Sequence, residues 1–263
     1  MSYTVVNNII FFDWDFNKIL DNEIIQVIKL SDTIYFNNYD NIIVCLKTKN
    51  KYNNDYNYSW KGSKFNQLIN NLPNSIIYLT LGYSFNQLLN NLPNSITHLT
   101  LGYSFNQPIN NLPNSIIHLT LDWYFNQQIN NLPNSIIYLT FDWYFNQPIN
   151  NLPNSITHLR LGYCFNKSIN NLSNTLTYLT LGYFFNQSIN NLPNSITHLT
   201  LGDEFNQQIN DLPNSITHLI LGRYFNQSIN NLPLLLKEIQ IDINNKNIYK
   251  IRVKYPQCKI VEY

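Results

Sequence analysis

The histidines of this chain could be read as metal ligands, because all of them occupy one position of a 20-residue pattern. Two histidines that are 20 residues apart would sit on neighbouring strands, about 4.8 Å from each other. A metal site needs three or four ligands, however, and no cysteine or carboxylate recurs beside them. We therefore predict a column of stacked, partly exposed rings, with no metal and no cofactor. The column comprises Tyr78, His98, His118, Tyr138, His158, Tyr178, His198 and His218.

Serine and glycine are also periodic, which argues against catalysis. The serine of Leu-Pro-Asn-Ser recurs in most units, as expected for a side chain that bonds to the backbone in every turn. No unique Ser-His-Asp set stands out, so we predict no catalytic residue and no enzymatic activity. All seven glycines share one column with Asp122, Asp142 and Asp242. Because both residue types tolerate positive φ, we expect sharp turns there rather than a phosphate-binding loop.

Charge and cysteine usage exclude further classes of protein. Residues 65–230 contain five acidic and three basic side chains, a net charge of −2, so no basic stripe could neutralise phosphates. The three cysteines are far apart and form no C-x-x-C pair, which excludes a zinc ribbon and a disulfide scaffold. No apolar run approaches the ~18 residues of a membrane helix, and the N-terminus makes a poor signal peptide. We expect an intracellular protein that binds neither nucleic acid nor membrane.

The elements that position these residues are repeats. A 20-residue unit begins with Phe-Asn nine times between Phe65 and Phe225, without insertion. Within the unit that starts at Phe105, the last apolar residues follow the L-x-x-L-x-L signature of a leucine-rich-repeat strand. Leu119 and Leu121 alternate with polar residues, so they should point inward, and the Asn-Leu-Pro-Asn-Ser stretch disfavours a return helix. The sequence predicts a β-rich, leucine-rich-repeat-like solenoid: an arc of low curvature with one parallel sheet and extended return segments.

Asparagine dominates the composition, with 48 residues, most of them at fixed positions of the unit. The position after each phenylalanine is our candidate for a structural ladder, in which an inward-facing amide satisfies the backbone groups of the turns. The alternative interpretation is a polar recognition stripe, which needs the same side chains to be exposed. The predicted ladder comprises Asn86, Asn106, Asn126, Asn146, Asn166, Asn186 and Asn206.

The unit resembles the FNIP repeat, a leucine-rich-repeat variant found in social amoebae and in giant DNA viruses of amoebae. Phe-Asn-Gln, Leu-Pro-Asn-Ser and the Leu-x-Leu strand carry the resemblance in register over residues 65–233. It implies a scaffold for protein–protein interaction and little about activity. Some members of the family are similar to substrate adaptors of ubiquitin ligases, with an F-box ahead of the repeats. A purely structural array, such as a virion component, is a further alternative.

The two ends depart from the repeat pattern. Phe16-Asn17 and Phe36-Asn37 are 20 residues apart, so we assign residues 1–64 to an N-terminal cap of degenerate repeats. An F-box is the alternative, because residues 20–28 faintly resemble its opening, although the typical proline is missing. We assign residues 65–244 to nine repeats. Residues 245–263 turn charged and are assigned to a C-terminal cap that covers the last apolar cross-section.

Two adjacent central units differ from the others and form the candidate partner-binding patch. Most units leave the strand as Gly-Tyr-x, whereas these two read Asp-Trp-Tyr. Tryptophan, tyrosine and arginine dominate binding hot spots, so we expect an unidentified protein partner to bind here, at one edge of the concave face. The alternative is a simple duplication of one unit, with tryptophans that pack only on each other. The patch comprises Asp122, Trp123, Tyr124, Tyr138, Asp142, Trp143, Tyr144, His158 and Arg160.

Overall fold

The computed structural model describes residues 3–6, 9–12, 33–36, 65–70, 72–74 and 76–263. They form one 13-stranded sheet in which the strands lie in sequence order. β1 is antiparallel to β2, and the later neighbours are parallel. The strands are β1 (Tyr3–Val6), β2 (Ile9–Phe12), β3 (Thr33–Phe36), β4 (Tyr78–Leu81), β5 (His98–Leu101), β6 (His118–Leu121), β7 (Tyr138–Phe141), β8 (His158–Arg160), β9 (Tyr178–Thr180), β10 (His198–Thr200), β11 (His218–Ile220), β12 (Glu238–Ile241) and β13 (Lys259–Glu262).

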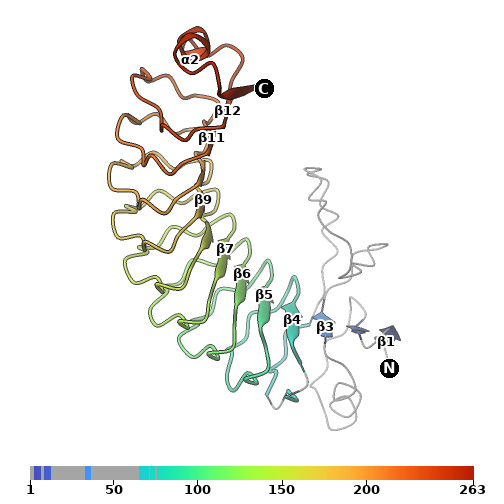
Figure 1. Cartoon of the computed structure of the whole chain (residues 1–263). Coiled ribbons are helices and arrows are strands. Elements are labelled where there is room, and N and C mark those ends of the chain that lie inside the picture. The colour runs from blue at the N-terminus through green and yellow to red at the C-terminus, as the bar shows by residue number, and fades with distance from the viewer. Residues whose placement is uncertain (1–2, 7–8, 13–32, 37–64, 71, 75) are drawn as a thin grey trace.

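Each unit contributes one short strand and a non-helical return, as the sequence predicts. In β6, Leu119 and Leu121 are buried while His118 and Thr120 are only half-buried, so the strand has an apolar inner side. Figure 1 shows the strands on the inner side of an arc and the return segments on its outer side. Across the described part of the chain the one helix is α2 (Ile248–Lys254), which lies beyond the repeats. The predicted parallel sheet with period 20 is therefore confirmed.

The core runs without interruption through the stack. All six apolar positions of the unit that starts at Phe105 are at most 8% exposed, and the equivalent residues of the other units join them in one cluster. The phenylalanines that begin the units form a stacked column, from Phe65 to Phe225, with 6.1–6.3 Å between ring centroids. A single unit would leave two faces of this core in water, so the fold exists only as an array.

The spacing of the ring columns accounts for the arc. On the open face of the sheet, neighbouring rings of the histidine–tyrosine column are 4.2–4.4 Å apart. The buried phenylalanine rings are 6.1–6.3 Å apart over the same step. Successive units are therefore closer on the open face than in the core, and the stack bends with the sheet inside (Figure 1). Our expectation of low curvature took account only of the missing return helix and overlooked this difference in spacing.

The recurring serine bonds one unit to the next. Ser115 Oγ donates to the carbonyl of Ile96 over 2.7 Å, and Ser135 donates to the carbonyl of Ile116 over the same distance. Where one unit has Thr175 instead, its hydroxyl lies 3.0 Å from the equivalent carbonyl of Ile156. The side-chain-to-backbone role expected of this position is confirmed, and its bonds run between units rather than within one turn.

The reason we gave for the glycine column is wrong. No described glycine has positive φ, and the left-handed residues are Asn91 and Asn131. Glycine is needed for space instead. A methyl group on Gly182 would lie 1.9 Å from the carbonyl oxygen of Gly162, and one on Gly162 would lie 1.5 Å from that of Asp142. The backbones of successive units meet at this column so closely that a side chain fits at only some steps.

The close approach begins at one place in the array. The amide of Asp122 donates to the carbonyl of Leu101 over 2.9 Å, and Asp142 donates to Leu121 over the same distance, which extends the sheet by one bond. The strands β8 to β11 have three residues instead of four, and the glycine that follows each of them lies against the carbonyl of the preceding unit. The two aspartates therefore occupy the last units with the wider spacing.

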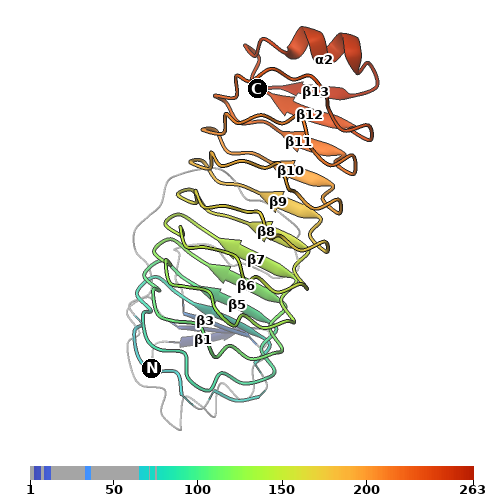
Figure 2. The ribbon, with the colours of Figure 1, turned by 90° about the vertical axis from the view of Figure 1, so that its left-hand side faces the viewer.

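Helix α2 and strand β13 lie at the C-terminal end of the stack (Figure 2). Helix α2 buries Ile251 against the core, and the Tyr255 hydroxyl accepts the amide of Leu232 over 2.8 Å. Asn247, which is 5% exposed, accepts the amide of Ile229 and so satisfies the end of the return segment. The inward-facing Glu262 of the last strand forms an ion pair with Arg252. An inward charge on an edge strand opposes pairing with another sheet.

At the N-terminal end, β3 pairs with β4, and the register places Phe36 opposite Leu81. Phe36 thus occupies a strand-leucine position, and our interpretation of it as the first residue of a repeat is wrong. The misleading signal was the Phe-Asn dipeptide, which also arises where a strand ends. Phe16 and the F-box-like residues 20–28 lie outside the described residues.

The glycine geometry gives a direct test. Gly182→Ala should lower the free energy of unfolding by about 1–3 kcal/mol, the range for overpacking, because backbone atoms must move. Gly102→Ala should cost less, since its methyl group would meet the nearest carbonyl oxygens at 2.7 Å rather than 1.9 Å. Urea denaturation of the two variants measures the difference. Equal losses would contradict steric exclusion as the reason for glycine.

Candidate interaction surface at the edge of the sheet

The open face of the sheet carries a continuous stack of imidazole and phenol rings, here called the inner stack. It begins at Tyr78 and ends at His218, and neighbouring centroids are 4.2–4.4 Å apart. Four of its histidines place Nδ1 within 2.7–2.9 Å of the preceding threonine hydroxyl. Among the described residues no group of three or more metal-ligating side chains exists. The stacked rings we predicted are confirmed.

Packing lowers the pKa of four histidines of the inner stack, His98, His118, His158 and His198. Burial lowers the pKa of His98, His158 and His198, and repulsion from a neighbouring histidine adds to the effect at His198. At His118, burial first and then the positive charges of His98 and His158 lower the pKa to about 4. These groups therefore add no positive charge to the open face at pH 7.

A second column, here called the edge stack, follows the end of the strands. Its rings belong to the turns after β4 to β9, and their centroids are 4.0–5.4 Å apart. Both predicted tryptophans lie in the middle of it: Trp123 and Trp143 stack at 4.3 Å, and Trp143 stacks on Tyr163 at 4.0 Å. The edge stack comprises Tyr83, Tyr103, Trp123, Trp143, Tyr163 and Tyr183.

Three further rings, here called the outer rings, lie outside the edge stack. Tyr124, Tyr144 and Phe184 are 42–44% exposed, which is high for large aromatic side chains. Tyr124 and Tyr144 are parallel, with centroids 5.2 Å apart. Tyr124 is perpendicular to Tyr103, and Phe184 is perpendicular to both Tyr163 and Tyr183.

The two aspartates of the patch sit side by side in the glycine column. Asp122 Oδ1 accepts the amide of Trp123 over 2.7 Å. Burial first, and then the neighbouring carboxylate of Asp142, raise the pKa of Asp122 to about 7. In the described part of the chain the ion pairs, Arg252–Glu262 and Lys259–Glu238, both lie in the segment from β12 to the last strand. This acid pair is therefore held without a basic partner.

The asparagine positions form a hydrogen-bonded ladder that is not inward-facing. Asn126 Oδ1 accepts the amide of Asn146 over 3.0 Å and the side-chain Nε2 of Gln147 over 3.2 Å. The Asn-to-Asn bond repeats at each step from Asn66 to Asn226. None of these asparagines is buried, so the expected inward orientation is wrong. The bonds run along the surface from one unit to the next.

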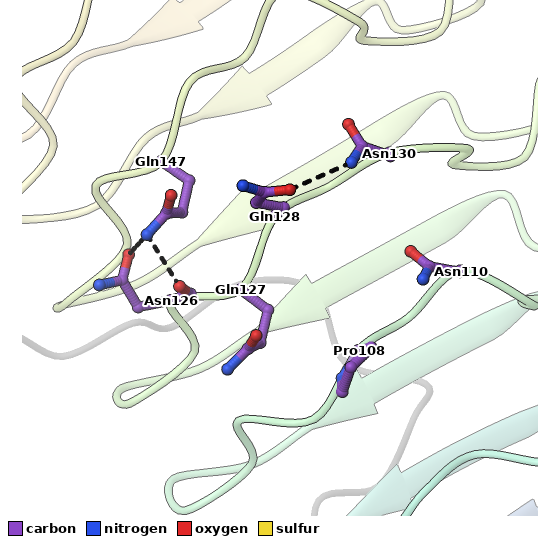
Figure 3. A pocket seen from close by; sticks show the side chains of 7 residues that line it. All are labelled: Pro108, Asn110, Asn126, Gln127, Gln128, Asn130 and Gln147. Atoms are coloured by element: carbon purple, nitrogen blue, oxygen red, sulfur yellow. Dashed lines mark hydrogen bonds between the residues drawn. The ribbon is translucent and has the colours of Figure 1, made fainter.

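The outer side of the arc carries shallow polar hollows near the same ladder. Figure 3 shows one of about 390 Å³, lined by Pro108, Asn110, Asn126, Gln127, Gln128, Asn130 and Gln147. In it Gln147 points to the side chain and carbonyl of Asn126, and Asn130 donates to Gln128 over 3.3 Å. Its polar side chains are all neutral amides, several already bonded to each other, so it supplies no group for acid–base chemistry.

Comparison with known proteins identifies the family. The model of the FNIP Repeat matches in overlapping segments from residue 65 to residue 243, namely 65–104, 88–111, 105–142, 125–164, 145–184, 165–204, 185–211 and 205–243. The chain belongs to the FNIP-repeat family. No curated protein matches this FNIP-repeat chain.

A solved structure supports the same fold. It is titled "The crystal structure of CroV588 a novel circular LRR protein structure" and comes from a giant virus. It is 42% identical to this FNIP-repeat chain, with a TM-score of 0.68 over 76% of this chain and 36% of that one. Our chain thus spans little more than a third of the viral protein's length. No helix among the residues described here is long and apolar enough to cross a membrane.

The structure brings most of the predicted patch together, on β7 and β8 and in the turns that follow β6 and β7. Tyr138 pairs in register with His158, and their rings lie 4.4 Å apart. Arg160 is exposed on the open face, one position beyond His158 on that side of the strand. The prediction missed how far the surface extends, because it considered only the units with tryptophan. Alignment of the turns would have revealed Tyr103, Tyr163 and Phe184 in the same columns.

The ladder predicts how individual FNIP-repeat asparagines respond to substitution. Asn126→Leu should cost about 1–3 kcal/mol of unfolding free energy, because the amide of Asn146 loses its acceptor. Asn126→Asp retains the acceptor oxygen and should cost much less. Asn130→Leu is the matched control, since Asn130 is exposed and bonds only to Gln128. Urea denaturation measures all three. Equal losses in the two leucine variants would contradict the ladder assignment.

Proposed function

We propose that this FNIP-repeat chain is a non-catalytic scaffold that binds a protein partner through the open face of its sheet and the aromatic edge beside it. The observation that carries the proposal is the continuity of the edge stack and the outer rings across six turns. The outer rings Tyr124, Tyr144 and Phe184, which are 42–44% exposed, provide the large rigid contact area typical of binding hot spots.

Several features favour binding over chemistry. His118 in the middle of the inner stack is held neutral and contacts other rings on both sides, which suits a rigid surface and not a proton shuttle. The side chains of the recurring serines and of the ladder asparagines already form hydrogen bonds between units. What remains free on the open side is the area of the rings, a stripe of threonines and the exposed Arg160. Rigid repeats that present such an extended surface are typical protein-binding modules.

The experiment is capture from amoebal lysate, identification of the bound protein and titration with variants. Trp123→Ser with Trp143→Ser should weaken the identified complex at least tenfold, because it removes two central rings. Trp123→Tyr with Trp143→Tyr is the matched control for stability, since it restores the residue of the neighbouring units. A serine pair that stays folded and binds the captured partner like the wild type would exclude this edge as the site.

A further inference from the structure

Inside the edge stack, a ring with a stacked neighbour on each side has both of its faces covered. Tyr163 lies between Trp143 at 4.0 Å and Tyr183 at 4.7 Å, so both of its faces are covered. Phe184 meets Tyr163 at 84°, with 5.1 Å between centroids. The covered ring must therefore present its edge to one face of Phe184. The opposite face accounts for the 44% exposure of Phe184.

The same geometry recurs three units earlier in the stack. Tyr103 lies between Tyr83 at 4.3 Å and Trp123 at 5.4 Å, and Tyr124 crosses it at 87°. Tyr144 is parallel to Tyr124 within 5° and equally exposed. The edge thus offers flat aromatic faces on Tyr124, Tyr144 and Phe184, backed by rings that fix them in place. An aromatic face carries the negative part of the ring quadrupole and attracts cations.

The charges around these faces have one sign. The turns from residue 82 to residue 224 contain four acids, Asp122, Asp142, Asp203 and Glu204, and one base, Arg223. Their formal net charge is −3, or −2 when Asp122, whose pKa is raised to about 7, is protonated. None of the four acids is in an ion pair within the described residues. Arg160 is the nearest strand residue with a positive charge, and it lies on the open face of β8. Four histidines of the inner stack, His98, His118, His158 and His198, do not offset the acids, because their pKa values are lowered.

Building on the proposed function, we infer that this edge receives an extended, arginine- or lysine-rich segment of the partner protein. Cations would lie over the free faces of the outer rings and be attracted by the unpaired carboxylates. A phosphate backbone or an acidic segment would be repelled by the same charges. The segment would run along the axis of the stack, perpendicular to the strands, because both the faces and the acids follow that direction.

The repeat sets the spacing of such a segment. Asp142 and Asp203 are three units apart, roughly 14 Å at the usual distance between strands. An extended chain rises about 3.3 Å per residue, so two cations about four residues apart would reach both carboxylates. The exposed rings of Tyr144 and Phe184 lie in the same interval of the stack and would contact the residues between them.

Fluorescence anisotropy with labelled twelve-residue peptides tests the inference on the full chain. An alternating Arg-Ser peptide should bind at least tenfold more tightly than Gln-Ser or Glu-Ser peptides of equal length. Asp203→Asn with Glu204→Gln, and separately Tyr124→Ser with Tyr144→Ser, should each weaken Arg-Ser binding about fivefold or more. Asp211→Asn and Tyr249→Ser are the matched controls, an acid and an aromatic exposed elsewhere, and should change it less than twofold.

A variant that binds the Arg-Ser peptide more tightly cannot be explained by misfolding, which would weaken binding. Arg223→Gln removes the one base of these turns and should strengthen Arg-Ser binding about twofold. Equal binding of the three peptides, or equal weakening by edge and control variants, would overturn the inference. If the captured partner depends on Trp123 and Trp143 while the Arg-Ser peptide does not bind, the proposed function stands and its cationic chemistry fails. If the peptide binds at the edge and the Trp123→Ser, Trp143→Ser variant leaves the partner complex unchanged, the edge has the cationic preference but the proposed function fails for that partner.

Discussion

The structure depends on one constraint: each unit satisfies its neighbour's backbone through bonds that recur with a period of 20 residues. Asn126 accepts the amide of Asn146, Ser135 donates to the carbonyl of Ile116, and the strands pair without a shift of register. A net bond of this kind contributes only about 1 kcal/mol, but an unmade one costs more when the group is shielded from water. The uninterrupted period is therefore a physical requirement, because a change of length in one unit removes the partners of the next.

The same constraint creates the surface. Side chains at equivalent positions must lie one strand apart, so a residue type that recurs becomes a column without any further design. Tyrosine at Tyr103, Tyr163 and Tyr183 gives the edge stack, and the change to Trp123 and Trp143 enlarges its centre. Asparagine suits the ladder better than aspartate for a related reason, because carboxylates stacked at this spacing would repel each other. Only variable positions such as residues 122–124 are left to determine what the surface recognises.

The contrast between positions fixed by the repeat and variable positions explains which features could be predicted from the sequence. The inward leucines, the absence of return helices and the stacked histidines follow from spacing alone, and the structure has them. The orientation of Asn126 did not follow, because periodicity shows that a side chain is needed without showing on which side of the turn it lies. The role of Gly182 depends on how closely two backbones approach, a distance that no residue pattern encodes. Phe36 misled because one dipeptide arises in two structural contexts. The outer faces of Tyr124 and Phe184 depend on ring orientation, which only coordinates provide.

The most direct measurement compares two insertions in the middle of the array. One adds a single glycine between Asn126 and Gln127, and the other adds a second copy of residues 125–144. Both place new residues at the same site, but only the second preserves the register of 20. Urea denaturation should show that the added unit leaves the free energy of unfolding equal to or above that of the parent chain. The single glycine should lower this free energy by the contribution of several hydrogen bonds, about 1 kcal/mol for each bond. Equal stability of the two insertions would contradict the claim that bonds between equivalent positions hold the fold together.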